Sequence, residues 1–289
     1  METPNSEKYS YEQKVLDHGF VRLVDYMGDD NAIVQAARVS YGAGTKSLSS
    51  DRQLIRYLMR HRHTTPFEMC ELKFHVKLPI FVARQWIRHR TANVNEISGR
   101  YSEMVDEFYV PELEQIRPQS LVNKQGRSES AFEATEAQEI QAQLEQTQKE
   151  LYTEYKDSLD KNLARELARI NLPLSLYTEW YWKIDLHNLF HFLHLRLDAH
   201  AQYEIRVFAE AMAAITKELF PIAYEAFEDY RLHSIGFTGP EIKIVQQLLS
   251  SKDYSVEQLV ELGLSKREST EFVKKLSFIR SFTSDNNGV

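Results

Sequence analysis

The segment CELKFHVKL, residues 70–78, alternates without interruption between apolar and polar side chains. From Cys70 to Leu78 every second residue is apolar, and the residues between them are Glu, Lys or His. A period of two places alternate side chains on opposite faces, so the segment is predicted to be a strand with one buried face. A second segment, LYTEWYWKI at 176–184, alternates in the same way and predicts a second such strand.

Helices are predicted on both sides of the first strand. Residues 20–27, FVRLVDYM, indicate one more strand, followed by an acidic helix cap at 29–31 and a helix to about Val39. A turn is expected at 41–44, YGAG, and the polar triplet 49–51 caps another helix that ends in HRHTTP, 61–66. Beyond the strand, a helix is expected from Pro79 to about Arg90.

The second half of the chain is also predicted to be mainly helical. After irregular loops at 91–101 and 112–130, a long amphipathic helix carries apolar residues from Ile140 to Leu159. Asp185 is expected to cap a helix that continues to Asp198, and a further helix is expected from about Ala199 to Leu219. The expected class is α+β, mostly helical with a small antiparallel or mixed sheet.

Three segments are expected along the chain. Residues 1–14 read as a polar leader, residues 15–233 as a catalytic domain, and residues 234–289 as a C-terminal extension with two weaker helical patterns. The chain has no run of about 18 apolar residues and no apolar signal core near Met1, so no membrane span is predicted and a cytoplasmic location is expected.

Charge and cysteine usage exclude several classes of function. With 35 Lys and Arg against 42 Asp and Glu, the chain of 289 residues has a net charge of −7, which argues against binding a nucleic-acid polymer. An anionic ligand must therefore be held by a local basic cluster. The only cysteine, Cys70, lies in a strand pattern as a small buried hydrophobe, which leaves no disulfide framework and no thiolate zinc site.

The densest polar cluster runs from Arg84 to Tyr101. Between Arg84 and Arg100 there are four arginines and one glutamate, a local charge of 4 − 1 = +3 in an acidic chain. Guanidinium groups hold phosphate with forked, charge-assisted hydrogen bonds, and the Ser98-Gly99 pair can bring backbone N–H groups close to an anion. The interleaved Gln, Asn and Ser residues suit a nucleotide better than the alternative, a solvated helix face with ion pairs.

A second cluster follows the second strand and is rich in histidine. It consists of Asp185, His187, His191, His194, Arg196, His200 and Glu204. His187 and His191 are four residues apart, the spacing of a metal clamp, so a metal-dependent hydrolase is one alternative. No glutamate lies beside His187 to act as a base, and Arg196 disfavours a bound dication, so no metal site is predicted.

Two glycine patterns do not meet the requirements of nucleotide-binding loops. Residues 42–47, GAGTKS, lack the spacing of a P-loop. No G-x-G-x-x-G follows a predicted strand, so no dinucleotide is expected to bind in the Rossmann manner.

The stretch RHRTANVNEISGRY, residues 88–101, resembles the signature of the flavin-dependent thymidylate synthases, R-H-R-x-x-S-x-N-E-x-S-x-R-Y. It differs at one fixed position, where Asn93 replaces a serine. Five flanking segments also resemble the family in order: AARVSYG at 36–42, HRHTTPFE at 61–68, FHVKLPIFVARQW at 74–86, ARINLPLSLYTEWYW at 168–182 and FLHLRLDAHAQYEIR at 192–206. The resemblance spans about residues 15–230 and implies the fold of the thymidylate synthase-complementing proteins.

The resemblance also implies a role for individual residues. Those expected to contact FAD are Thr65, Arg88, His89, Arg90, Glu96, Asp185, His187 and His191. In many relatives the last three are Asn, Arg and Asn. Those expected to contact deoxyuridylate (dUMP) are Gln85, Trp86, Ile87, Arg88, Glu96, Ile97, Ser98, Gly99, Arg100, Arg169 and Arg196. Arg196 matches the family's activating arginine at the pyrimidine edge, and His63 resembles a histidine near folate and flavin.

The implied reaction is the reductive methylation of dUMP to dTMP. Methylenetetrahydrofolate supplies the carbon and FAD, reduced by NADPH, supplies the hydride; the family's ligands bridge the chains of a homotetramer. A route without a cysteine nucleophile agrees with the ordinary strand pattern around Cys70, since an arginine can activate the pyrimidine electrostatically. The alternatives are a nucleotide-binding regulator without turnover and the metal-dependent hydrolase at His187 and His191.

Overall fold

A computed structural model describes residues 11–39, 48–121, 124–248 and 254–281. Its contacts divide the chain into two compact units, Met1–Leu232 and His233–Val289. The larger unit carries the sheet and every residue of the two polar clusters.

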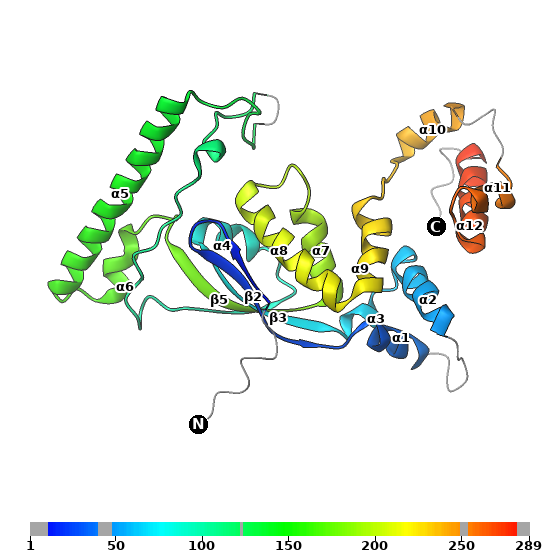
Figure 1. Ribbon diagram of the computed structural model, residues 1–289, viewed down its shortest axis with the longest axis horizontal. Coiled ribbons are helices and arrows are strands. Elements are labelled where there is room, and N and C mark those ends of the chain that lie inside the picture. Colours follow the sequence, from blue (N-terminus) through cyan, green and yellow to red (C-terminus); the bar gives the residue numbers. More distant parts are fainter. Residues whose placement is uncertain (1–10, 40–47, 122–123, 249–253, 282–289) are drawn as a thin grey trace. The chain divides into compact units, whose positions relative to one another are not determined.

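A five-stranded antiparallel sheet forms the centre of the larger unit (Figure 1). In spatial order its strands are β1 (Glu12–Val15), β2 (Gly19–Met27), β3 (Glu71–Pro79), β5 (Tyr177–Asp185) and β4 (Asn93–Glu96). The two alternating segments are the neighbouring strands β3 and β5, which pair along their whole length with Phe74 opposite Trp182 and Val76 opposite Trp180. The predicted α+β class with a small sheet is confirmed.

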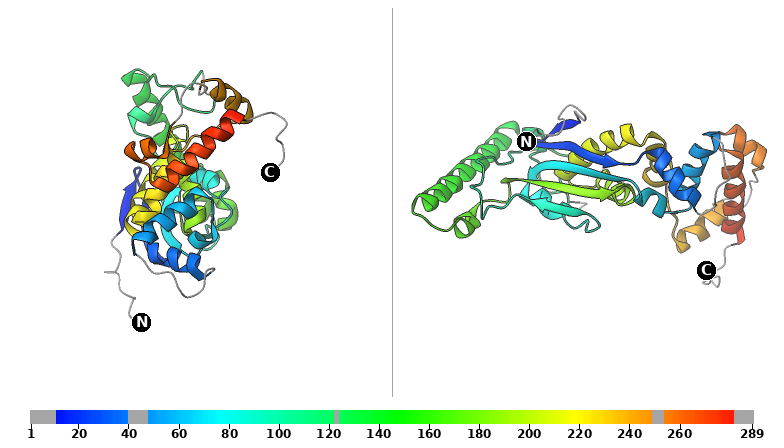
Figure 2. Two further views of the ribbon diagram at one scale, coloured as in Figure 1. Left: turned by 90° about the vertical axis from the view of Figure 1, so that its right-hand side faces the viewer. Right: turned by 90° about the horizontal axis from the view of Figure 1, so that it is seen from below.

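The apolar face of the sheet packs against helices, as the alternation predicts. Every apolar residue of β3 is fully buried, and so is Cys70 just before it. Helix α4 (Ile80–Trp86) follows β3 directly, α7 (Leu186–Arg196) follows β5 directly, and α8 (Tyr203–Leu219) packs over β2. Figure 2 shows α8 lying along the sheet.

The remaining helices of the larger unit lie beyond the two ends of the sheet (Figure 1). At one end are α1 (Asp30–Val39), α2 (Leu48–Arg60), α3 (Thr65–Glu68), α9 (Pro221–Phe227) and the π-helical turn η3 (Glu228–Leu232). At the other end are η1 (Leu113–Gln115), α5 (Ala134–Asp160), α6 (Arg165–Ala168) and the 3-10 turn η2 (Arg169–Asn171). The smaller unit contains α10 (Gly239–Leu248), α11 (Val256–Glu261) and α12 (Lys266–Ser281). Within the described ranges, no helix is both long and apolar enough to cross a membrane.

Several predicted boundaries were wrong, each at a polar end of an element. Helix α4 ends at Trp86 rather than near Arg90, because Trp86 is the last residue that reaches the core, and α8 begins at Tyr203 rather than Ala199. Helix α2 begins at Leu48, so residues 49–51 form its first turn rather than its cap. In its described residues, 233–248 and 254–281, the smaller unit has three helices where two were expected, and part of the expected loop 91–101 is strand β4. The turn expected at 41–44 and the loop 42–47 lie outside the described residues.

Candidate active site

The first polar cluster starts where α4 leaves the core. Trp86 is fully buried, with its ring 5.2 Å from Trp182 and 4.7 Å from Phe192. This packing anchors the helix, so the residues that follow, among them the exposed Arg88 and Arg90, project beyond the core. The ring of Trp86 is too buried to contact a ligand, so only the backbone of this residue is available for such a contact. Of its two neighbours, Gln85 is half-buried and Ile87 is exposed.

The two polar clusters of the sequence meet at His89 and Arg196. The Nε of Arg196 donates a hydrogen bond to Nε2 of His89 over 3.1 Å. Burial, Arg196 and His191 lower the pKa of His89 to about 4, so its imidazole is neutral at physiological pH and can accept this bond. Burial and the nearby Arg88 lower the pKa of Arg196 as well, which indicates that positive charge is concentrated here.

Helix α7 brings His191 of the second cluster to the same place. His191 lies one turn before Arg196, and its ring centre is 6.0 Å from that of His89. Asp185 is the N-cap of this helix, and its carboxylate accepts bonds from the backbone N and the side-chain Nδ2 of Asn188 over 2.9 and 2.7 Å. The cap predicted at Asp185 is confirmed, and it occupies both carboxylate oxygens.

A second group of predicted site residues forms a cradle, residues 98–100 with Arg169. A Cβ on Gly99 would lie 2.7 Å from Sδ of Met104 and 3.1 Å from Cδ of Arg169, so any larger residue here would require both side chains to shift. The Oγ of Ser98 accepts a bond from the backbone N of Arg100 over 3.3 Å. The Nε of Arg100 pairs with Glu166 over 3.1 Å, and both side chains are more than half exposed.

Strand β4 separates the cradle from the His89–Arg196 contact. Asn93, which replaces the family's serine, begins the strand on its exposed edge, and Glu96 ends it by accepting a 2.6 Å bond from Oγ1 of Thr178. Ile97 then donates from its backbone N to Glu179 and exposes its side chain. At about 3.4 Å per residue, the four residues of β4 place roughly 10 Å of extended chain between the two groups.

A pocket lies beside His191, between α2, α3, α7 and η3. It is lined by Leu58, Met59, Arg62, His63, Thr64, Phe67, His187, Phe190, His191 and Arg231. Its lining combines an apolar floor with two arginines and three histidines, and none of these lining residues is acidic. The chemistry of this lining suits part of a ligand that joins an aromatic ring to an anionic group.

The two arginines of this pocket were not predicted from the sequence, and one predicted residue lies next to the pocket. Arg62 stands within the quoted segment HRHTTPFE, so its neighbour His63 could have drawn attention to it. Arg231 is isolated in the sequence, and no pattern points to it. Thr65 begins α3 directly after the lining residue Thr64. No structural observation tests the ligand contacts expected of the predicted residues, and they remain predictions.

Neither a metal centre nor a cysteine nucleophile is supported. Among the residues that the structure describes, no group of three or more His, Cys, Asp or Glu could hold a metal ion. His187 and His191 instead share their pocket with Arg62 and Arg231, whose charge opposes a dication. Cys70 is fully buried, and burial raises the pKa of its thiol to about 12, which makes it a poor nucleophile.

Comparison with known proteins gives one consistent result. The family model described as thymidylate synthase complementing protein matches residues 22–222. A flavin-dependent thymidylate synthase of Ruegeria pomeroyi is 56% identical over 275 residues, covering 93% of this chain and 90% of that protein. One of Wolbachia pipientis is 57% identical over 265 residues and 92% of each chain.

A solved structure shares the fold. The UMP/dUMP methylase PolB from Streptomyces cacaoi, bound with 5-Br UMP, superposes with a TM-score of 0.68 at 36% identity. The match covers 77% of this chain and 99% of that one.

Proposed function

Because this chain belongs to the thymidylate synthase complementing protein family, the flavin-dependent thymidylate synthases, we propose that it converts dUMP to dTMP in dTTP biosynthesis. The chain is a methyltransferase with a flavin cofactor. We further propose that the flavin is FAD, that NADPH reduces it, that 5,10-methylenetetrahydrofolate donates the carbon, and that the protein is cytoplasmic. The observation that carries the proposed chemistry is the contact of Arg196 with a neutral His89.

Arg196 is proposed to activate the pyrimidine. C5 of uracil must become electron-rich before it can accept a one-carbon unit, and a guanidinium at the ring edge stabilises the negative charge that develops when N3 ionises. His89 accepts from Nε of Arg196 and so fixes the plane of the guanidinium, leaving its two terminal nitrogens for the substrate. Half-burial strengthens this interaction relative to water.

The cradle is proposed to bind the phosphate of dUMP. Arg100 and Arg169 supply forked donors, and the turn at Ser98 and Gly99 supplies backbone N–H groups. Arg88 and Gln85 then lie on the His89–Arg196 side, with the base.

The pocket beside His191 is proposed to hold the flavin. His63, His187 and His191 line this pocket. The ring of His89 lies near that of His191, and Arg90 is the next residue of the same loop. When bound, the reduced flavin supplies the hydride that turns the transferred methylene into a methyl group. The protein's own part is to bind and orient the ligands and to exclude a cysteine route, since Cys70 is buried and neutral.

The active site is proposed to be shared between chains of a homotetramer. Within one chain β4 separates the cradle from Arg196, so a single nucleotide would be contacted by the cradle of one chain and Arg196 of another. Large apolar side chains are exposed around the cradle, as at an interface: Ile97, Tyr101, Leu167, Ile170 and Leu174.

Mixing two inactive variants tests the shared site. Arg100→Ala and Arg196→Ala proteins, co-expressed or refolded together, should regain about a quarter of the wild-type sites if the two arginines of one site come from different chains. Each variant alone should stay inactive. Mixed oligomers that recover no activity would rule out sharing but leave the methylation intact.

The cofactor is tested on the purified wild-type protein. It should be yellow and release a flavin that chromatographs as FAD, and it should form dTMP from dUMP, the folate and NADPH. FMN, or a colourless protein that binds dUMP without turnover, would overturn the proposal and favour a regulator.

A further inference from the structure

Arg231 lies outside the segment that defines the family, yet it contributes to the wall of the pocket. The family match ends at residue 222, and α9 continues from there into the π-helical turn η3. Arg231 is the fourth residue of that turn and lines the pocket together with His187 and His191. Turns of this type are rare and occur preferentially at functional sites.

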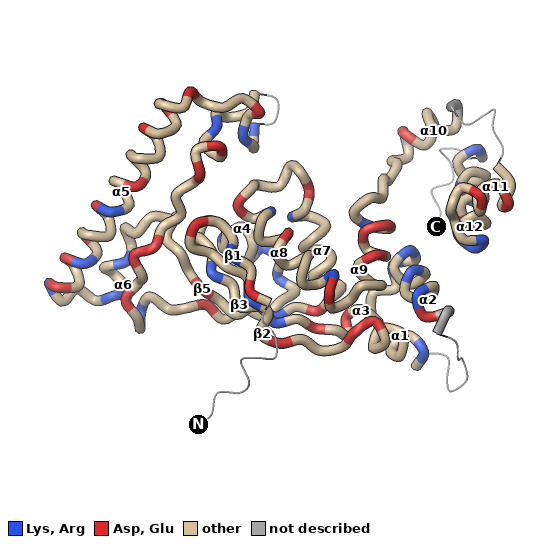
Figure 3. Tube along the Cα trace, in the orientation of Figure 1, with Lys and Arg blue, Asp and Glu red and all other residues tan. Residues whose placement is uncertain are grey.

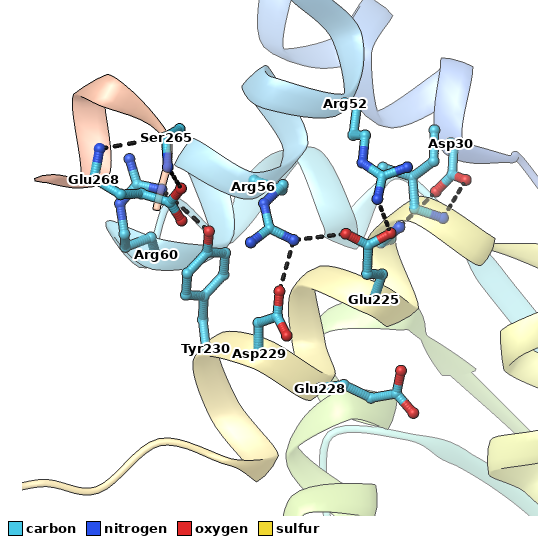
Figure 4. A network of polar contacts seen from close by, with 12 residues as sticks. Asp30, Arg52, Arg56, Arg60, Glu225, Glu228, Asp229, Tyr230, Ser265 and Glu268 are labelled. Atoms are coloured by element: carbon cyan, nitrogen blue, oxygen red, sulfur yellow. Dashed lines mark hydrogen bonds and ion pairs between the residues drawn. The ribbon is translucent and has the colours of Figure 1, made fainter. Parts of the chain in front are cut away.

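A network of ion pairs holds the turn against α2 (Figure 4). Arg56 bridges two acids, with Nη1 2.7 Å from Glu225 and 2.7 Å from Asp229, and its guanidinium lies 4.8 Å from the ring centre of Tyr230. One turn further along α2, Nη1 of Arg60 donates to the hydroxyl of Tyr230 over 3.3 Å. Figure 3 shows the same pairing as basic segments of α2 beside acidic segments of α9. Arg231, the next residue after Tyr230, is therefore held in a defined position.

The end of α2 supplies the second arginine of the pocket. Arg62 has a left-handed backbone conformation, with φ of 58°, which is uncommon for a residue other than glycine. Such conformations concentrate at functional sites, where the surrounding structure enforces them. The next residue, His63, is tied back to α2 by a 2.9 Å bond from its backbone N to the carbonyl of Leu58.

Building on the proposed function, we propose that Arg231 and Arg62 together bind the diphosphate of a dinucleotide. The two guanidinium groups are close enough that Arg62, after burial, lowers the pKa of Arg231. Two like charges side by side at a pocket without an acidic lining residue match the two adjacent phosphates of a diphosphate, which each guanidinium can contact with a forked pair of hydrogen bonds.

Two ligands of the reaction carry this group. FAD and NADPH are both diphosphate-linked dinucleotides, and the pocket's apolar floor, with Phe67 and Phe190, suits an aromatic ring beside the diphosphate. FAD fits better because the same pocket contains the histidines expected to meet the flavin. NADPH is the other source of the same chemistry, and the experiment separates the two.

The test compares Arg231→Gln and Arg231→Lys with a control that loses the same charge elsewhere. Arg117→Gln is that control, because Arg117 is exposed on a distant loop and bonds to the carbonyl of Glu114. FAD affinity is measured by flavin fluorescence on flavin-depleted full-length protein, and NADPH affinity from the rate of flavin reduction in reloaded protein. Losing charge-assisted bonds should weaken one dinucleotide about tenfold or more in Arg231→Gln, and less in Arg231→Lys.

Salt dependence separates charge capture from a packing effect. If Arg231 binds the diphosphate, the FAD affinity of Arg231→Gln should fall less steeply with salt than that of wild type or Arg117→Gln. A selective loss for NADPH would support the diphosphate assignment and assign the pocket to NADPH. Unchanged affinity for both dinucleotides in folded Arg231→Gln would overturn the proposal. Wild-type protein that binds no flavin would instead overturn the proposed function.

Discussion

The two halves of the proposed nucleotide site are built differently. Arg196 is half-buried and donates to a neutral His89, whose ring contacts Phe192, which stacks on the buried Trp86. Arg100, at the other end of β4, is more than half exposed and pairs with the acid of Glu166. A charge that must stabilise a developing charge benefits from a low dielectric and a fixed geometry, whereas a charge that captures a phosphate dianion must be reachable and able to exchange partners.

The largest expected effect is a loss of methylation rate when Arg196, the half-buried arginine, is changed. Arg196→Lys keeps the positive charge but loses the planar fork and the Nε bond to His89, so we expect the rate of methylation to fall about 100-fold or more. dUMP affinity should change much less, because the cradle is intact. Single-turnover oxidation of reduced enzyme by dUMP and folate measures the step. An undiminished rate would reduce Arg196 to a structural role and remove the contrast between the halves.

His89, the partner of Arg196, should make the free energy of unfolding depend on pH. The pKa of His89 is about 4 in the folded protein, below its ordinary value of 6.5, so the unfolded chain binds more protons between these values. Stability is therefore full above pH 6.5 and is lost as the pH falls towards 4, by at most about 1.4 kcal/mol per pH unit. Urea unfolding of the flavin-free protein at several pH values measures it.

The matched variants are His89→Gln, which keeps an acceptor, and His200→Gln on an exposed residue. The slope between pH 4 and 6.5 should flatten in the first and persist in the second. Equal slopes in all three proteins would mean that His89 titrates normally.

A substitution beside Arg100, the exposed arginine, should strengthen dUMP binding rather than impair function. Glu166 competes with the substrate phosphate for Arg100, so Glu166→Gln should tighten dUMP binding. Exposed ion pairs are weak, which limits the gain to about two- to fivefold. The exposed Glu154→Gln on α5 loses the same charge away from the cradle and should show no gain. Weaker dUMP binding in Glu166→Gln would make Glu166 a positioning residue for Arg100 instead.

The smallest effect on turnover is expected at Cys70, which lies in neither half of the proposed nucleotide site. Cys70→Ser should leave turnover nearly unchanged, since the thiol is buried and un-ionised, although a hydroxyl in its place costs some stability. Turnover is compared with the midpoint of thermal unfolding. A large loss of activity in well-folded protein would reinstate a cysteine nucleophile and contradict the electrostatic role of Arg196.

The central part of the fold was predictable because its pattern is local. Strands β3 and β5 each have one face in the core, and their alternation reveals this without knowledge of the partner strand. Strand β4 has no such pattern, since all four of its residues are exposed. It exists because residues 93–96 pair with residues 180–183 of β5, a long-range contact that local periodicity does not report.

The candidate site was predictable only where residues cluster in the sequence. Residues 84–101 form a dense polar motif, and the structure brings one of them, His89, to Arg196. Glu166 and Arg231 are isolated charges in the sequence, and they reach the cradle and the pocket only because α6 and η3 are folded there. No composition rule distinguishes such a residue from a solvated charge.

The tryptophan cluster has a spectroscopic consequence. All three tryptophans of the chain, Trp86, Trp180 and Trp182, are buried together, and their indole nitrogens have no hydrogen-bond partner among the described residues. Trp86 also stacks on Phe192, which touches His89, so the cluster is connected through Phe192 to the His89–Arg196 contact. Light absorbed by any indole is therefore emitted from one apolar environment, and a flavin bound nearby would accept that energy and dim the emission, which gives the enzyme a built-in optical signal of cofactor occupancy.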